Sequence, residues 1–188
     1  MPKLNANNLD LIPRIPLTLE LIREHYHRPM TDDEARERLE TVQHECAHLV
    51  AGIACGGVLP ELQIHAPKES GRRPAGRTNI AVCNDAQEAF WSFAGYVWER
   101  HYVGSTKRAE DDLEAGRYYA QRGGIQHEPL LAAAEQFVTV DGVQAIRDAT
   151  VGVVCLIPQS GVLSNTNLKH LTAWLKKRTR RPVGVPVR

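Results

Sequence analysis

The stretch TDDEARERLETVQHECAHLVAGIACGG, residues 31–57, decides most of the fold. Thr31 and Glu34 form a capping-box pattern, and Asp32 adds negative charge where the helix dipole favours it. Apolar residues then recur every three or four positions, as on one face of a helix, until Gly56 follows. This apolar seam consists of Ala35, Leu39, Val42, Cys46, Leu49 and Ile53. The sequence therefore predicts a long helix that begins at Asp32 and buries one face.

The same helix carries the pattern HECAH at residues 44–48. Histidines four residues apart lie one helical turn apart, so His44 and His48 can reach a single metal ion. At about 100° per residue, both histidines lie about 160° from Cys46, away from the apolar seam. The intervening Glu45 projects toward a metal-bound water. This spacing is typical of zinc-dependent hydrolases, which use the glutamate as a general base.

Catalytic zinc needs a third protein ligand and an open fourth position. Candidates are the six other histidines and the acidic run at 110–112, and the residues alone do not choose among them. The alternative interpretation is that His44 and His48 lie on a solvated helix face and bind no metal. The chemistry of the site therefore depends on a group distant in the sequence.

The remaining patterns predict a mainly α-helical fold with a small β-sheet, an α+β class. Extended pieces are expected at 62–65 and 78–82. Further helices are expected at 84–102, at 107–122, at 129–156 with a break near Asp141 and Gly142, and at 165–177 with Asn165 or Thr166 as cap. We expect an N-terminal arm over 1–30, one domain over 31–177, and a basic tail over 178–188.

Composition indicates an ordinary soluble globular protein. The chain has 188 residues, of which 43% are hydrophobic, and a net charge of +1, which gives no electrostatic reason to expect a nucleic-acid partner. No run of 18 apolar residues and no signal-peptide pattern occurs, so we expect a cytoplasmic protein without a membrane span. The four cysteines lack paired spacing and are expected to be free thiols.

The order of several short motifs resembles the peptidase domain of FtsH-type zinc metallopeptidases. These motifs are HECAH at 44–48, ELQIHAP at 61–67, AGRTNIAV at 75–82, FAGYVWER at 93–100 and DDLEAGRYYA at 111–120. The resemblance implies an FtsH-like fold with a zincin-type active-site helix. The chain departs from the family at Ala47, where glycine is usual, and at Asp111, where asparagine is common.

The resemblance also implies roles for residues outside the zinc helix. Asp112 is implied as the third zinc ligand, with Asp111 as the alternative that the departure leaves open. Glu99 matches a family glutamate near the metal and is expected to orient a ligand histidine. The alternative for Glu99 is a surface ion pair with Arg100 or Arg108.

The predicted function is zinc-dependent endopeptidase activity, with Glu45 as general base on zinc-bound water. Gln63, Ile64 and His65 are expected to bind the polypeptide substrate by strand addition. Because no G-x-x-x-x-G-K-[ST] phosphate loop occurs, we expect flexible substrates or a separate delivery or ATPase partner. The sequence leaves the oligomeric state open.

Two other interpretations compete with the peptidase. One is a metal-stabilised protein-binding module of the same fold without activity, against which the intact Glu45 argues. The other is an iron oxygenase with two histidines and one carboxylate, whose ligands typically lie on strands rather than on a helix.

Overall fold

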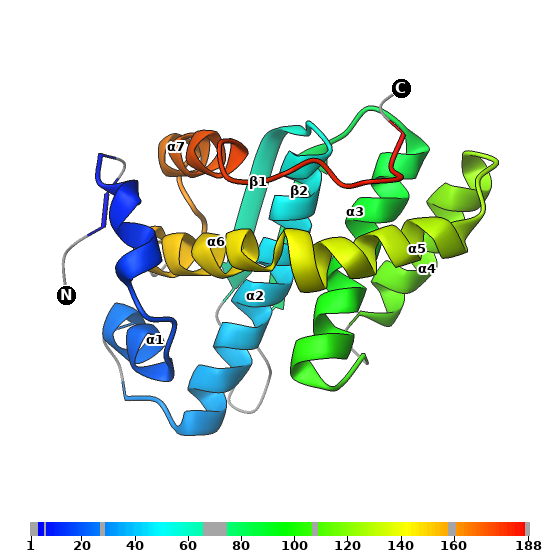
Figure 1. The fold of residues 1–188 in the computed structure, drawn as a ribbon. Helices are drawn as coiled ribbons and strands as arrows, with labels where there is room; N and C mark the ends of the chain where they lie inside the picture. Colours follow the sequence, from blue (N-terminus) through cyan, green and yellow to red (C-terminus); the bar gives the residue numbers. More distant parts are fainter. Residues whose placement is uncertain are drawn as a thin grey trace.

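The computed structural model describes residues 4–5, 7–26, 29–65, 75–106, 109–157 and 161–186. Within them the chain is mainly helical with one two-stranded antiparallel sheet, as the sequence predicts (Figure 1). The elements are η1 (Leu9–Arg14), α1 (Leu19–Tyr26), α2 (Asp32–Ala54), β1 (Val58–His65), β2 (Ala75–Ala81), α3 (Asp85–Trp98), η2 (Glu99–Val103), α4 (Glu110–Arg122), α5 (His127–Gln136), η3 (Phe137–Asp141), α6 (Val143–Leu156) and α7 (Asn165–Lys176). The first, η1, is a 3-10 helix, whereas η2 and η3 are π-helical turns.

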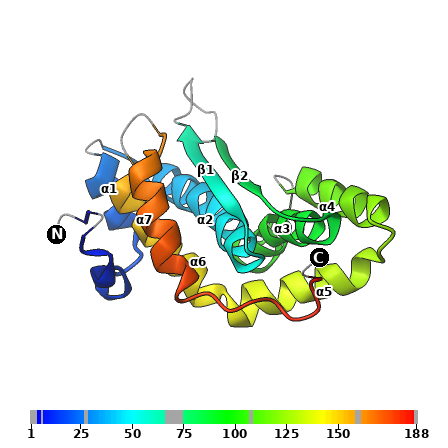
Figure 2. The same cartoon turned by 90° about the horizontal axis from the view of Figure 1, so that it is seen from above.

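Helix α2 is the central element, and it begins at Asp32 as predicted. Thr31 Oγ1 accepts the Glu34 N–H at 3.2 Å, and Glu34 Oε2 accepts the Thr31 N–H at 2.9 Å. This capping box satisfies two main-chain donors that the helix leaves unpaired. The predicted apolar seam is buried at Val42, Cys46 and Leu49. In Figure 2, α1 and α7 lie on one side of α2, and α3 with α4 on the other.

The sheet packs on α2, with β1 antiparallel to β2. Both strands begin earlier than predicted, at Val58 and Ala75, and a bulge interrupts the register between Val58 and Glu61. The edge of β1 away from β2 is partly covered by residues 161–163. Ile64 N–H donates to the Gly161 carbonyl at 2.6 Å, and the Leu62 carbonyl accepts the Leu163 N–H at 3.3 Å.

The helices beyond the sheet differ from the predictions mainly at their ends. The predicted helix 84–102 is α3 followed by the π-helical turn η2, and the expected break near Asp141 is the π-helical turn η3. Helix α4 begins at Glu110, and residues 107–108 lie outside the described part. The cap of α7 is Ser164 rather than Asn165 or Thr166, because Ser164 Oγ accepts the Asn167 N–H.

Both ends of the described chain pack on the body. Ile12 and Ile22, near the N-terminus, belong to the same buried core as α2. Asp10 Oδ1 accepts hydrogen bonds from Trp174 Nε1 at 2.9 Å and from the Arg178 guanidinium at 3.0 Å. The C-terminal segment runs from α7 past α6 toward α3, where the Pro186 carbonyl accepts a bond from Gln87 (Figure 2). Among the described helices, none has the length and apolar character of a membrane span.

Replacing Thr31 by alanine tests the role of the capping box. Thr31→Ala leaves the first-turn N–H groups of α2 without their side-chain acceptor, so we expect the free energy of unfolding to fall by about 1 kcal/mol. Urea unfolding followed by circular dichroism measures this loss. Thr166→Ala is the matched control, because Thr166 is exposed in the first turn of α7 and does not cap it. Equal effects of the two substitutions would contradict the capping role.

Candidate metal centre

Three side chains from two helices converge at one point. His44 Nε2 and His48 Nε2 on α2 lie 3.2 Å apart. Asp112 Oδ2 on α4 lies 3.2 Å from the first of these nitrogens and 3.3 Å from the second. Asp112 Oδ2 is buried and has no hydrogen-bond partner among the described residues. Ligand atoms of all three residues lie within 4.8 Å of one another, and they form a group able to hold a metal ion.

The spacing of these atoms fits a small tetrahedral ion. Zinc binds imidazole nitrogen and carboxylate oxygen at about 2.0–2.2 Å, so two ligand atoms at tetrahedral positions stand about 3.3–3.6 Å apart. The three observed separations, 3.2, 3.2 and 3.3 Å, lie close to that value. Two imidazoles and one carboxylate are also a donor set typical of zinc. The residues present therefore fit a zinc ion.

One row of residues along α3 supports the histidines from behind. The carbonyl of Trp91 lies 2.9 Å from His48 Nδ1, and because a carbonyl only accepts, Nδ1 carries the proton. The Nε2 atom of His48 then faces the site. Glu99 Oε1, two turns further along the chain and at the start of η2, lies 3.5 Å from His44 Nδ1. Carboxylate and carbonyl partners of this kind orient metal-binding imidazoles.

Gly95 lies between these two supports, and only a glycine fits there. A Cβ at residue 95 would stand 2.3 Å from His48 Nε2 and 2.9 Å from His44 Cε1. Any larger residue would displace the imidazoles. The close approach of α3 to α2 therefore depends on this position.

A second glycine, Gly116, lets α4 pack close to the site. Asp112 and Gly116 are four residues apart, so they share one face of α4. A Cβ at residue 116 would stand 2.3 Å from the ring of Phe93 on α3. The glycine lets α4 pack closely on α3, and the same face presents Asp112 to the histidines. The side chain of Asp112 is 25% exposed, so the group is not sealed from solvent.

Strand β2 positions the glutamate of the HECAH pattern. Thr78 Oγ1 donates to Glu45 Oε2 at 2.7 Å, and the other oxygen, Oε1, lies against Gly76. A Cβ at residue 76 would stand 2.4 Å from that oxygen. Glu45 is only 5% exposed. Its carboxylate is therefore held in one place by the strand that passes over α2.

The site buries acidic side chains beside its two histidines. Glu99 is 1% exposed, and neither of its oxygens has a hydrogen-bond partner among the described residues. Burial opposes protonation of His44, but the Asp112 and Glu99 carboxylates outweigh it and raise the pKa of the imidazole to about 10. Burial likewise opposes ionisation of Asp112, yet His48 and His44 hold the pKa of its carboxyl well below the usual range. A bound cation would balance these carboxylates.

The structure brings together His44, His48 and Asp112, and it places Glu99 behind His44. Asp111 is exposed and lies outside this group. Because Glu99 is buried, it does not form the alternative surface ion pair; Arg108 lies outside the described residues.

The expectation for Gln63, Ile64 and His65 needs correction. The main chain of Ile64 is already paired with Gly161, so this edge of β1 is not free for strand addition. The strand that touches Glu45 is β2 instead. The side chain of His65 lies outside the described part of the structure.

Two groups that position side chains of the site were not predicted from the sequence: the Trp91 carbonyl, which contacts His48, and the Thr78 hydroxyl, which contacts Glu45. The Trp91 carbonyl is a main-chain atom, and no side-chain pattern marks it. Thr78 is one polar residue in a strand with several others, and only the fold shows that it meets Glu45. Glu99 was predicted through the resemblance, within the FAGYVWER motif, whereas the close helix approach at Gly95 was not predicted.

No family model, no curated protein and no solved structure matches this chain.

Paired aspartate variants test which carboxylate binds the metal. Asp112→Asn replaces the group that lies between the two Nε2 atoms, and we expect zinc affinity to fall at least tenfold. Asp111→Asn removes the same charge from the neighbouring exposed residue and should leave zinc affinity unchanged. Competition with a chromogenic chelator measures both affinities. A larger loss with Asp111→Asn would reverse the assignment.

Proton release on metal binding tests the electrostatics of the site. With its pKa near 10, the imidazole of His44 carries a proton at pH 7 in the metal-free protein, and metal binding must displace it. The Asp112 carboxyl is already ionised at that pH. We therefore expect about one proton to be released from His44 per zinc ion, and zinc affinity to rise with pH. Calorimetry in buffers of different ionisation enthalpy counts the protons; zinc binding without proton release would contradict this account.

Proposed function

We propose that this protein is a zinc-dependent endopeptidase. The observation that carries the proposal is the set of three ligand atoms separated by 3.2–3.3 Å on α2 and α4, together with the buried Glu45, which follows His44 directly in α2. A site that only stabilises a fold needs no such glutamate, whereas metal-assisted hydrolysis uses one as a base.

The order of elements around the site supports the family resemblance. The HECAH helix is followed by a two-stranded sheet, by a helix with the Gly95-to-Glu99 spacing and by a helix that begins with the acidic run. This is the order that the motifs of FtsH-type peptidase domains imply. We therefore propose an FtsH-like peptidase fold with α2 as the zincin-type helix.

His44, His48 and Asp112 would hold the zinc ion, which supplies Lewis acidity toward an attacking water and the scissile carbonyl. Glu45 takes the proton from that water on Oε1 and delivers it to the leaving amine. Thr78 keeps the other oxygen of Glu45 occupied, so the carboxylate does not rotate away between the two transfers. Glu99 keeps His44 oriented during the reaction.

The open edge of β2 offers a place for an extended polypeptide. Leu62 and Ile64 direct their main-chain groups away from β2, toward 161–163, so the bonds between the strands run through alternate residues. The opposite residues of β2, among them Gly76 and Thr78, then direct their main-chain groups to the other edge. Among the described residues no strand pairs with that edge. Strand addition there would place a peptide bond beside Glu45 and would make few demands on sequence.

The substrates we propose are unfolded or flexible polypeptides, because strand addition at the open edge of β2 requires an extended main chain. Folded proteins would need a separate delivery or ATPase partner.

Replacing Glu45 by glutamine tests the hydrolytic function. Glu45→Gln keeps the size of the side chain but removes the base, so cleavage of unfolded casein should fall at least about 100-fold while zinc content is unchanged. Glu110→Gln, at the exposed start of α4, is the matched control and should cleave like the wild type. Intact casein with a zinc-loaded wild-type protein would instead favour the metal-stabilised binding module.

A further inference from the structure

The charges of the chain are unevenly distributed along it. Of its 23 lysines and arginines, seven lie within residues 162–188, and none of its 22 aspartates and glutamates does. The net charge of +1 is therefore the total of a basic segment and an acidic remainder. Because the expectation against a nucleic-acid partner rests on that total, it does not extend to the basic segment by itself.

Helix α7 and the residues that follow it expose five of these cations. Lys169 and Lys176 are two helical turns apart, so they lie on one face of α7. Lys177, Arg180 and Arg181 follow at the C-terminal end of the helix. All five residues are exposed, and none forms an ion pair with a described residue. We call these five residues the basic patch.

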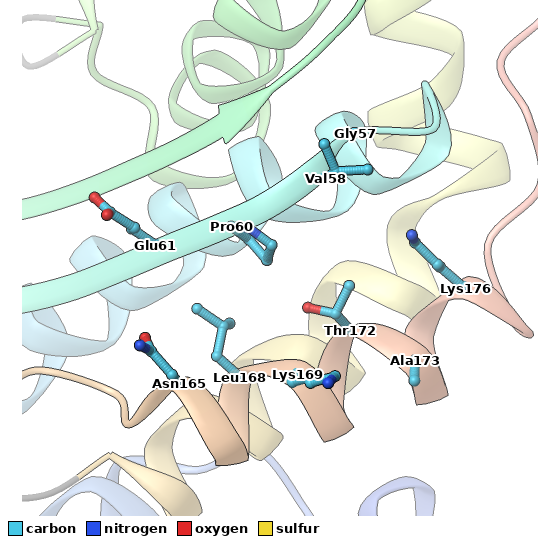
Figure 3. Close-up of a pocket in the computed structure, with 10 residues that line it drawn as sticks. All are labelled: Gly57, Val58, Pro60, Glu61, Asn165, Leu168, Lys169, Thr172, Ala173 and Lys176. Atoms are coloured by element: carbon cyan, nitrogen blue, oxygen red, sulfur yellow. The ribbon is translucent and has the colours of Figure 1, made fainter.

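Two contacts bring the ends of the basic patch together. Lys176 lines a pocket that also borders Gly57, directly before β1 (Figure 3). Arg181 acts on Cys55, two residues earlier: burial raises the pKa of the Cys55 thiol to about 12, and the guanidinium of Arg181 partly offsets this rise. Lys176 and Arg181 therefore both lie near the turn between α2 and β1.

Two acidic residues near the basic patch are directed elsewhere. Asp10 accepts hydrogen bonds from Trp174 and Arg178, which is why Arg178 is not counted in the patch. Glu61 lies on β1, across the pocket from α7, and its carboxylate points away from the helix (Figure 3). The five cations of the patch are therefore left without a fixed counter-charge among the described residues.

The basic patch lacks the large apolar groups that several anionic partners require. The apolar side of α7 is buried, and no exposed residue of 165–181 is a large aliphatic residue, Phe, Tyr or Trp. One valine, Val183, is exposed just beyond the patch. A membrane-surface helix inserts large apolar residues among the lipids, and a protein interface needs an apolar core. A nucleic-acid backbone is instead bound chiefly through its charge.

Of the forms of nucleic acid, the basic patch fits a duplex. Single strands are held by bases that stack on exposed aromatic side chains, whereas Trp174 of α7 is only 8% exposed and is covered by Arg178. Lys169 and Lys176 lie about 10 Å apart along α7, and a duplex carries one phosphate charge per about 1.7 Å of its axis. The patch can therefore meet several phosphates at once, with side chains that only donate hydrogen bonds to oxygens that accept them.

We propose that the basic patch binds the phosphate backbone of duplex nucleic acid without reading its sequence. Backbone contacts of this kind carry no sequence information. The site goes beyond the proposed peptidase function and shares no residue with the metal centre. Duplex DNA and duplex RNA present the same phosphate chemistry, so each serves as a probe.

Fluorescence anisotropy of labelled duplexes measures their binding to the whole protein between about 50 and 200 mM KCl, a range over which backbone binding weakens steeply. We expect the triple variant Lys169→Gln/Lys176→Gln/Arg180→Gln to weaken binding at least tenfold at the lowest salt. Since each lost phosphate contact lowers the slope of log affinity against log salt by about one, the slope should fall by about three. Two DNA duplexes of unrelated sequence should bind equally.

The matched control is Arg36→Gln/Arg117→Gln/Arg147→Gln, which removes the same charge from exposed residues of α2, α4 and α6. It should leave the salt slope unchanged. Circular dichroism and thermal unfolding check that both triple variants fold like the wild type, which we expect because all six side chains are exposed.

Tighter binding of DNA identifies DNA as the source of the backbone, and tighter binding of RNA identifies RNA; both support the proposal. It is overturned if neither duplex binds, if the two triple variants weaken binding equally, or if the two DNA sequences bind unequally. Phosphatidylserine vesicles or polyglutamate that bind more tightly than the duplexes would also overturn it, in favour of a membrane or an acidic protein. Cleavage activity has no part in these measurements, so their failure is distinguishable from failure of the proposed peptidase function.

Discussion

The contact between α2 and α3 at Gly95 is the constraint on which the metal centre depends. Because residue 95 has no side chain, the backbone of α3 comes close enough for its Trp91 carbonyl, and for the Glu99 carboxylate at the start of η2, to reach the two histidines. These partners engage the Nδ1 side of each imidazole. The Nε2 atoms are thereby directed to the same point, where Asp112 arrives from α4. The close packing of α3 on α2 thus sets the positions of the histidine nitrogens that meet Asp112.

The charges of the site fit the proposed cation. Glu45, Glu99 and Asp112 place three carboxyl groups around two imidazoles, in surroundings where an unpaired anion is expensive. The proton on His44 compensates only part of that charge. A divalent ion at this point would be held directly by Asp112 and the two histidines, and it would displace the His44 proton. The donor set and the charges around it therefore fit a divalent cation.

Sequence patterns predicted local features well and distant contacts poorly. The capping box at Thr31 and the apolar seam fixed the start and the buried face of α2, because both signals act within a few residues. The pairing of His44 with His48 followed from helix geometry alone. Asp112 came from the family resemblance, since no local rule connects α4 with α2. The partners Trp91 and Thr78 could not be predicted, because one acts through its main chain and the other through a contact 33 residues away.

The hydrogen bonds of Asp10 to Trp174 and Arg178 join positions 164 and 168 residues apart. The entropy lost in closing a loop grows with its length, so a contact spanning most of the chain becomes favourable only after the segments between its ends have been ordered. We therefore expect this contact to form late in folding. An interaction absent from the transition state acts on the rate of unfolding rather than on the rate of folding. Because the Asp10 side chain is 85% exposed, we expect the polar link between the two ends of the chain to slow unfolding only modestly.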